Sequence, residues 1–414
     1  MDKVLLKIGV NTIIQSIGKV ISVALSIATV FLLTRYLGSS GYGNFTLAFT
    51  YVSFFSVFAD FGLQSTLVRE FSQKGHNKKE HESSFLLKTL LVCISSICAF
   101  IVLWFFPYEP VVKIGISIAI LAVAVSGISS FGNIIFQSKV RLDLITVVDL
   151  VTKVATVFFT LIFIYFKLNI FFIILTVLLG NIIGLILTFF LLKNSFKFHY
   201  DSQQIKKIFI ASFPVGISAF LGLAYFKVDT IMLSVLRNSN EVGIYTLPYK
   251  VLENVLVLWG FYMASVFPLI AKFNGEKNKK EIQKLFKQSF FLSLILSMPI
   301  IILGILFSPA IIYALAGNGF SLSIYALRIL LMSLPFLFIN VLLSDLCIVF
   351  NESKMVIYSI AISLIFNVLL NLWLIPLYGF IGASYATVLS AMMQTVCSII
   401  LIQFSGLKAK IYDQ

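Results

Sequence analysis

Long apolar runs separated by short polar connections constrain this chain more than any other feature of its sequence. Each run holds roughly the 20 residues that an α-helix needs to cross a bilayer. The runs lie at about 8–33, 45–68, 85–106, 112–135, 145–166, 169–192, 208–235, 243–271, 288–308, 322–350, 355–377 and 379–404. Backbone N–H and C=O groups in lipid must bond within their own segment, and the alternating pattern of a β-barrel strand is absent. We therefore predict an all-α polytopic membrane protein with about twelve transmembrane helices.

Composition supports this class of protein and leaves little room for a soluble domain. Of the 414 residues, 59% are hydrophobic and only 12% are charged, whereas soluble domains are about half apolar and a quarter charged. The net charge of +14 would suggest a nucleic-acid partner for a soluble protein. Here the charge lies in short connections between apolar runs, so we interpret it as a topology signal and expect no nucleic-acid binding.

The lysines and arginines of these connections predict the orientation of the chain, because cytoplasmic loops are enriched in both. With a cytoplasmic N-terminus, 22 of the 31 fall in cytoplasmic segments, Lys88 among them, and 4 fall in outer connections. A wrong number of helices would scramble this segregation. We therefore expect an even number of spans and both termini in the cytoplasm.

The connections contain little that could support catalysis or hold a cofactor. The longest outer connection, 308–321, is uncharged, so we expect no glycosyltransferase or polymerase site and no enzyme activity. His76, His81 and His199 lie in predicted loops and no Cys-x-x-Cys pair occurs, so we expect no metal site. The Gly-x-x-x-x-Gly-Lys-Ser/Thr phosphate-binding motif is also absent, and we expect no cofactor.

An internal repeat predicts how the helices are grouped. The segment Leu32–Leu47 aligns without gaps on Met232–Leu247, and both segments end one helix and begin the next. An even number of helices separates the two copies, so both halves share one orientation. Parallel repeats of six helices usually place the substrate path between them. We predict two related six-helix bundles, 1–200 and 201–414, around a central cavity.

Ten charged residues fall within the apolar runs, where each costs about 2.5–3.5 kcal/mol to insert. They are Lys19, Asp60, Asp149, Lys153, Lys227, Asp229, Lys250, Glu253, Arg328 and Asp345. Polar residues recur around several of them at helical spacing, as in Asn11, Gln15, Lys19, Ser22, Ser26 and Thr29. We predict that such polar stripes line a shared hydrated cavity.

Simpler explanations remain open for part of this pattern. The Ser and Thr residues could serve hydrogen bonds between helices. Asp149 with Lys153, and Lys250 with Glu253, stand at the spacing of local ion pairs within one helix. Lys227 and Asp229 point to nearly opposite faces of their helix, so we expect one of them to pair with a neighbouring helix.

Four motifs resemble those of one transporter family. They are RYLGSSGYGNF at Arg35–Phe45, DFGLQSTLVRE at Asp60–Glu70, FKVDTIML at Phe226–Leu233 and YGFIGASYATVLS at Tyr378–Ser390. In this order they resemble the Wzx-type flippases of O-antigen and capsular polysaccharide, which belong to the multidrug/oligosaccharidyl-lipid/polysaccharide exporter superfamily. The chain has Ser39 where many relatives have proline.

The resemblance implies alternating access in a bacterial inner membrane. It implies an undecaprenyl-pyrophosphate-linked oligosaccharide as substrate, with membrane lipid, a coupling ion (Na+ or H+), a polysaccharide polymerase and a chain-length regulator as partners. A pyrophosphate needs cations in a cavity of low dielectric, for which the candidates are Lys19, Lys227, Lys250, Arg328 and Lys153. The candidates for sugar or ion binding are Asn11, Gln15, Asp60, Asp229 and Asn367. The alternatives are a cation-coupled multidrug exporter of the same superfamily and a membrane-embedded polymerase.

Overall fold

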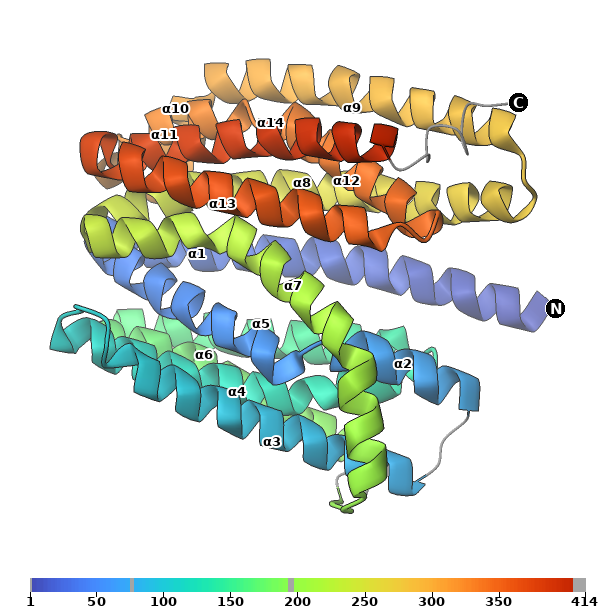
Figure 1. Ribbon diagram of the computed structural model, residues 1–414. Helices are drawn as coiled ribbons and strands as arrows, with labels where there is room; N and C mark the ends of the chain where they lie inside the picture. Colours follow the sequence, from blue (N-terminus) through green and yellow to red (C-terminus); the bar gives the residue numbers. More distant parts are fainter. Residues whose placement is uncertain (1, 75–77, 193–196, 405–414) are drawn as a thin grey trace. The chain divides into compact units, whose positions relative to one another are not determined.

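A computed structural model describes residues 2–74, 78–192 and 197–404, and within these ranges it holds helices and no strands (Figure 1). The side chains of residues 2–14, 16, 74 and 78 are not among those described. Ten helices in the described ranges are long and apolar enough to cross a membrane, and a bent helix pair would make an eleventh. The predicted fold class, an all-α polytopic membrane protein, is confirmed.

The chain divides into two compact units, Met1–Leu223 and Ala224–Gln414, with the boundary inside one long helix. The helices up to and including that one are α1 (Asp2–Asp60), α2 (Leu63–Lys74), α3 (Lys78–Leu103), α4 (Pro110–Ser138), α5 (Leu142–Tyr165), α6 (Ile170–Leu192) and α7 (Ser202–Leu236). The rest are α8 (Ser239–Gly275), α9 (Lys279–Leu306), α10 (Ser308–Ala316), the 3-10 turn η1 (Asn318–Phe320), α11 (Ser323–Leu331), α12 (Leu334–Val349), α13 (Ser353–Tyr378) and α14 (Phe380–Phe404).

The first predicted span and most of the second form α1, in which two helices meet at a kink without a loop between them. The chain bends between them at Gly38, whose φ of 66° and ψ of −174° are non-helical. Glycine adopts this backbone conformation without the steric cost that a Cβ would add. In the repeat alignment Gly38 corresponds to Asn238, where α7 gives way to α8 and the Asn238 side chain caps the new helix by accepting from the Glu241 N–H at 3.0 Å.

A second break follows Asp60, where the predicted span 45–68 was expected to continue. Phe61 and Gly62 both have positive φ, 41° and 76°, and α2 begins at Leu63. A Cβ on Gly62 would lie 2.7 Å from the Ser212 carbonyl oxygen in the first half of α7. The break is therefore a close contact between two backbones, and only glycine fits there.

In the first unit, α5 packs against α1 and α6, while α4 packs against α1, α3 and α6 (Figure 1). Close approach of α6 to α5 uses two glycines: a Cβ on Gly180 would overlap Thr156, and one on Gly184 would overlap Thr152. Small residues are the usual means by which helices approach each other in lipid. This contact fixes the position of α5, which bears the predicted site residue Lys153.

In the second unit, α13 and α14 form a tight hairpin, and α8 and α12 pack against α14. The predicted single span 322–350 is instead two helices, α11 and α12, that meet at a bend of 45°. Trp259 of α8 holds α12 in place, because its indole N–H donates to the Phe338 carbonyl at 3.0 Å and its ring stacks on the Phe338 ring at 4.6 Å.

Candidate functional site

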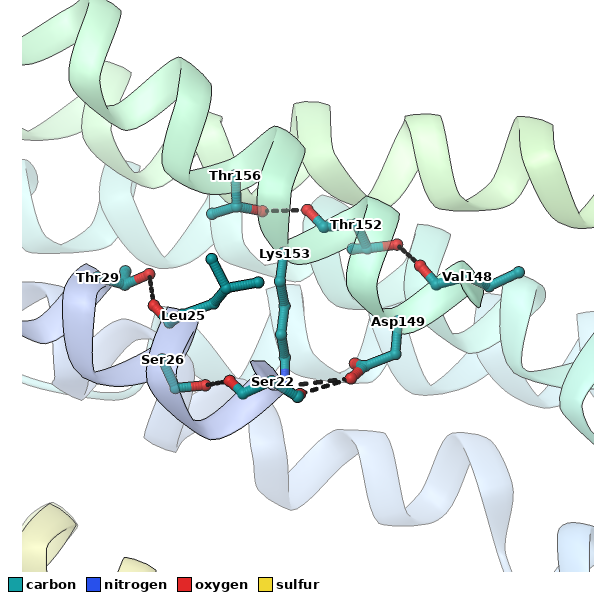
Figure 2. A network of polar contacts seen from close by, with 9 residues as sticks. All are labelled: Ser22, Leu25, Ser26, Thr29, Val148, Asp149, Thr152, Lys153 and Thr156. Atoms are coloured by element: carbon teal, nitrogen blue, oxygen red, sulfur yellow. Dashed lines mark hydrogen bonds and ion pairs between the residues drawn. The ribbon is translucent and has the colours of Figure 1, made fainter. Parts of the chain in front are cut away.

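A polar network joins α1 to α5 inside the first unit (Figure 2). The Ser22 hydroxyl donates to Asp149 Oδ2 at 2.6 Å. Lys153 Nζ lies 3.3 Å from the same carboxylate oxygen and also contacts Ser22 Oγ. The predicted local ion pair of Asp149 and Lys153 is therefore present, and it reaches across to a second helix. Both charged side chains stay accessible, with 48% of Asp149 and 33% of Lys153 exposed.

The hydroxyls that continue this network bond mostly to their own helices. Ser26 donates to the Ser22 carbonyl, and Thr29 donates to the Leu25 carbonyl, both at 2.9 Å (Figure 2). Thr156 does the same toward Thr152 in α5, also at 2.9 Å. Such back-bonding satisfies a hydroxyl without water or a second helix. The polar stripe of α1 therefore contacts the charged pair of α5 at Ser22, while its Ser26 and Thr29 hydroxyls are satisfied within the helix.

Lys19, one turn before Ser22, is exposed and has no hydrogen bond or ion pair within the described part of the chain. Gln15, a further turn away, is half-buried. Asn11 lies outside the residues whose side chains are described.

A second charged group lies in the second unit and joins α7 to α8. Lys227 Nζ lies 2.5 Å from Glu253 Oε1, and Lys250 Nζ lies 2.9 Å from Glu253 Oε2. We call these three residues the lysine–glutamate triad. Lys250 and Glu253 form the predicted local pair, and Lys227 adds the partner from the neighbouring helix. One carboxylate thus holds two cations, so the triad has one net positive charge, and its side chains are 25–44% exposed.

Asp229 faces away from the triad into the interior of the same unit, where it is 1% exposed. Its Oδ2 accepts hydrogen bonds from the Tyr245 and Thr387 hydroxyls, each at 2.8 Å, and its Oδ1 accepts from Asn371 Nδ2 at 2.5 Å. Asn367 extends this group, because its Oδ1 accepts from Asn371 at 2.9 Å. We call these five residues the Asp229 cluster.

The Asp229 cluster contains no cation to balance its carboxylate and has unsatisfied polar atoms. Within the described residues, Asn371 Oδ1 and the nearby Tyr225 hydroxyl are buried without a hydrogen-bond partner. Buried polar atoms of this kind are uncommon and call for a bound ion, a proton or water. The unpartnered atom of Asn371 is its amide oxygen, a ligand that hard cations accept.

Arg328 and Asp60 bond to other partners. The Arg328 guanidinium donates to the Ser308 hydroxyl at 2.8 Å and so ties α11 to α10. Asp60 Oδ1 lies 2.6 Å from Lys88 Nζ, which is almost completely buried in α3. The sequence placed His81 in a loop and Lys88 with the connecting segments, and the assignment of these residues to a loop was wrong. Both lie within α3, which begins at Lys78, and His81 packs on the Phe71 ring at 4.1 Å.

Residues 8–274 match the model of a family described as "Polysaccharide biosynthesis protein", and residues 214–373 match a second family, MatE. The chain is 19% identical over 392 residues to the "Putative O-antigen transporter" of Shigella flexneri, covering 90% of this chain and 92% of that protein.

Two solved structures share the fold at low identity. One is a multidrug resistance MATE family transporter of the MOP superfamily in an inward-facing conformation, with a TM-score of 0.78, 13% identity and coverage of 98% of this chain and 100% of that one. The other is the lipid II flippase MurJ in an inward closed conformation, with a TM-score of 0.76, 17% identity and coverage of 94% and 87%.

Proposed function

This chain belongs to the polysaccharide biosynthesis protein family, and from that premise we propose that it flips undecaprenyl-pyrophosphate-linked oligosaccharide repeat units. The movement is from the cytoplasmic to the outer leaflet of a bacterial inner membrane, by alternating access. Its relative and its structural neighbours are named as a transporter and a flippase, which agrees with transport and not catalysis. The segregation of Lys and Arg supports cytoplasmic termini.

The lysine–glutamate triad is the observation that carries this proposal. Its two lysines share one carboxylate, and all three side chains are partly exposed on predominantly apolar helices. A net cation in such surroundings is costly unless an anion or water reaches it. A pyrophosphate supplies that anion, and attraction between charges a few ångströms apart is several times stronger near protein than in bulk water.

Glu253 is the partner that the two lysines exchange for the pyrophosphate when substrate binds. While no substrate is bound, the carboxylate holds both ammonium groups at 2.5 and 2.9 Å. An arriving pyrophosphate competes for the same two lysines, so the site need not expose bare charges in the empty state. Release reverses the exchange, because Glu253 is already in place to take the lysines back.

Lys153, Asp149 and Ser22 form a comparable group in the first unit, with Lys19 beside it. We assign these residues to the same task, contact with the charged and hydroxyl-rich head of the substrate. The lipid tail would stay in the bilayer. A polymerase and a chain-length regulator would then act on the delivered units.

The Asp229 cluster is our candidate for the coupling ion, Na+ or a proton. A carboxylate, a threonine hydroxyl and asparagine amides supply the oxygen ligands that a hard cation prefers. The unsatisfied Asn371 Oδ1 and the lack of a balancing cation among the described residues fit a group that is complete only with an ion or proton bound.

Drug export is the alternative that a specific observation supports, because residues 214–373 match the MatE family. A strain that lacks this gene distinguishes the flippase from the drug exporter. In this strain, surface polysaccharide and the undecaprenyl-pyrophosphate-linked unit are measured together. Loss of surface glycan with the lipid-linked unit retained on the cytoplasmic side supports the flippase. Normal glycan with altered drug sensitivity supports the exporter, and single units displayed without long chains would indicate a polymerase.

A further inference from the structure

The turn between α7 and α8 is bonded directly to the turn between α13 and α14. Two residues make this contact, Arg237 at the end of α7 and Glu241 in the first turn of α8. They lie four residues apart on either side of the turn, with Arg237 Nε 4.0 Å from Glu241 Oε1.

Arg237 closes the end of α13. Its Nε donates to the Ile375 carbonyl at 3.0 Å, and its Nη2 donates to the Pro376 carbonyl at 2.7 Å. The last carbonyls of a helix lack partners within the helix. The Ile375 carbonyl also accepts from the Gly379 N–H at 2.8 Å, so Arg237 adds a second donor there and supplies a donor to the Pro376 carbonyl. The planar guanidinium suits this task, because its donors form a fixed fork.

Glu241 closes the start of α14. Its Oε2 accepts from the Phe380 backbone N–H at 2.9 Å, one of the N–H groups that a helix start leaves free. Between the two helices lies Gly379 with φ of 57°, and a Cβ there would overlap the Glu241 carboxylate. The turn therefore leaves room for the Glu241 carboxylate because residue 379 has no Cβ.

The four helix ends held in this way are those that supply the Asp229 cluster. Ile375 follows Asn371 by one turn in α13, and Glu241 precedes Tyr245 by one turn in α8. Arg237 follows Asp229, and Phe380 precedes Thr387, by about two turns each. Every contact lies in the second unit, and one or two turns of helix connect each of these four cluster residues to the contacts made by Arg237 and Glu241.

We propose that Arg237 and Glu241 are positioning residues that set the geometry, and so the cation affinity, of the Asp229 cluster. This inference rests on the proposed role of that cluster in ion coupling. The roles of the two residues are not interchangeable: position 237 must donate to carbonyls, and position 241 must accept from an N–H. Exchange of the two charges would restore the ion pair while placing each group against the wrong backbone partner.

The test measures cation binding to the full-length protein in detergent, by thermal unfolding. A ligand that binds only the folded state raises the unfolding temperature in a saturable way. One series adds NaCl in place of choline chloride at constant pH and ionic strength, and the other varies pH in choline chloride alone, so Na+ and protons are separated. We expect Asp229→Asn to abolish the response in whichever series shows one.

For Arg237→Gln we expect a response of similar amplitude, with the half-saturating cation concentration raised about tenfold. The double variant Arg237→Glu with Glu241→Arg should be no better. Arg237→Lys keeps the positive charge but not the fork of two donors, so its half-saturating concentration should fall between those of the parent protein and Arg237→Gln. This variant replaces Arg237→Gln in the test if glutamine at this position prevents folding. The matched control is Arg141→Gln, which breaks the exposed pair of Arg141 and Asp143, 2.9 Å apart in the first unit, and should leave the response unchanged.

The outcomes separate the two proposals. If Asp229→Asn responds like the parent protein, or if neither series gives a response, the ion site is wrong and this inference falls with it. If Asp229→Asn abolishes the response while Arg237→Gln and Arg237→Lys keep the parent affinity, the ion site stands and the positioning role is wrong. Full rescue by the charge exchange would show that an ion pair suffices and that backbone capping does not set the affinity.

Discussion

Lys88 Nζ of α3 lies 2.6 Å from Asp60 Oδ1 of α1, and the two partners are unequally buried: 2% of the lysine side chain is exposed against 34% of the aspartate. The pair sits where α1 ends, directly before the break at Phe61 and Gly62. It therefore fixes the point at which the chain turns from α1 into α2.

The unequal burial predicts unequal effects of removing each partner. Asp60→Asn leaves an unpaired ammonium in the interior and should lower the free energy of unfolding by about 3 kcal/mol. Lys88→Met leaves a carboxylate that water or headgroups can reach, and should cost about 1 kcal/mol. Denaturant unfolding in mixed micelles measures both, and the double variant should be more stable than Asp60→Asn alone. Equal losses for the two single variants would contradict this account.

The triad predicts opposite effects from its two kinds of residue. Lys227→Ala and Lys250→Ala remove cations and should weaken binding of a pyrophosphate-linked substrate, with Lys227→Ala abolishing export while the protein still inserts. Glu253→Gln frees both lysines and should tighten binding, by up to about tenfold, the equivalent of 1.4 kcal/mol. The same change should slow release, so export falls although affinity rises. Affinity for an undecaprenyl-pyrophosphate glycolipid in nanodiscs is the measurement, and unchanged affinity in Glu253→Gln would refute the exchange described above.

Lys19 and Lys153 should separate function from stability. Lys19 has no bonded partner within the described residues, so Lys19→Ala should abolish export with a change in unfolding free energy within about 0.5 kcal/mol. Lys153→Ala breaks the contact with Asp149 and Ser22 and should impair export with a stability loss of about 1 kcal/mol. Surface glycan, membrane abundance and thermal unfolding are compared for both. Normal surface glycan in Lys19→Ala and in Lys227→Ala would mean that the cationic mechanism is wrong.

The close backbone contact at the break after Asp60 is tested by substituting alanine for two glycines, Gly62 at the break and Gly222 as its control. Gly62→Ala places a Cβ at positive φ and 2.7 Å from the Ser212 carbonyl oxygen, and should destabilise the protein by about 2 kcal/mol. Gly222, within α7, has open space around the position of a Cβ. Gly222→Ala should be neutral or stabilising by up to about 1 kcal/mol, because alanine favours a helix. Thermal unfolding of both variants side by side checks the contrast, which disappears if the break is not a close backbone contact.

Much of this protein was determined by its sequence alone. The length and apolarity of the runs fixed an all-α membrane fold, since unpaired backbone groups in lipid leave little choice. The four motifs indicated the family, and the family model confirms it. The local pairs Asp149–Lys153 and Lys250–Glu253 followed from helical spacing, because both partners lie on one face of one helix. The substrate, the orientation in the membrane and the roles of the site residues stay predictions.

Only the tertiary structure decided which residues from different helices meet. Lys88 was counted with the loop lysines because it stands near the start of the predicted run 85–106, yet its partner Asp60 lies 28 positions away. Lys227 and Asp229 are two residues apart, and the structure sends one to Glu253 and the other to Tyr245, Thr387 and Asn371. Arg237 and Glu241 gave no signal in the sequence, because their partners are backbone atoms 138 and 139 residues away. Periodicity along one helix predicts the face on which a side chain lies, but the packing of the helices determines what that face meets.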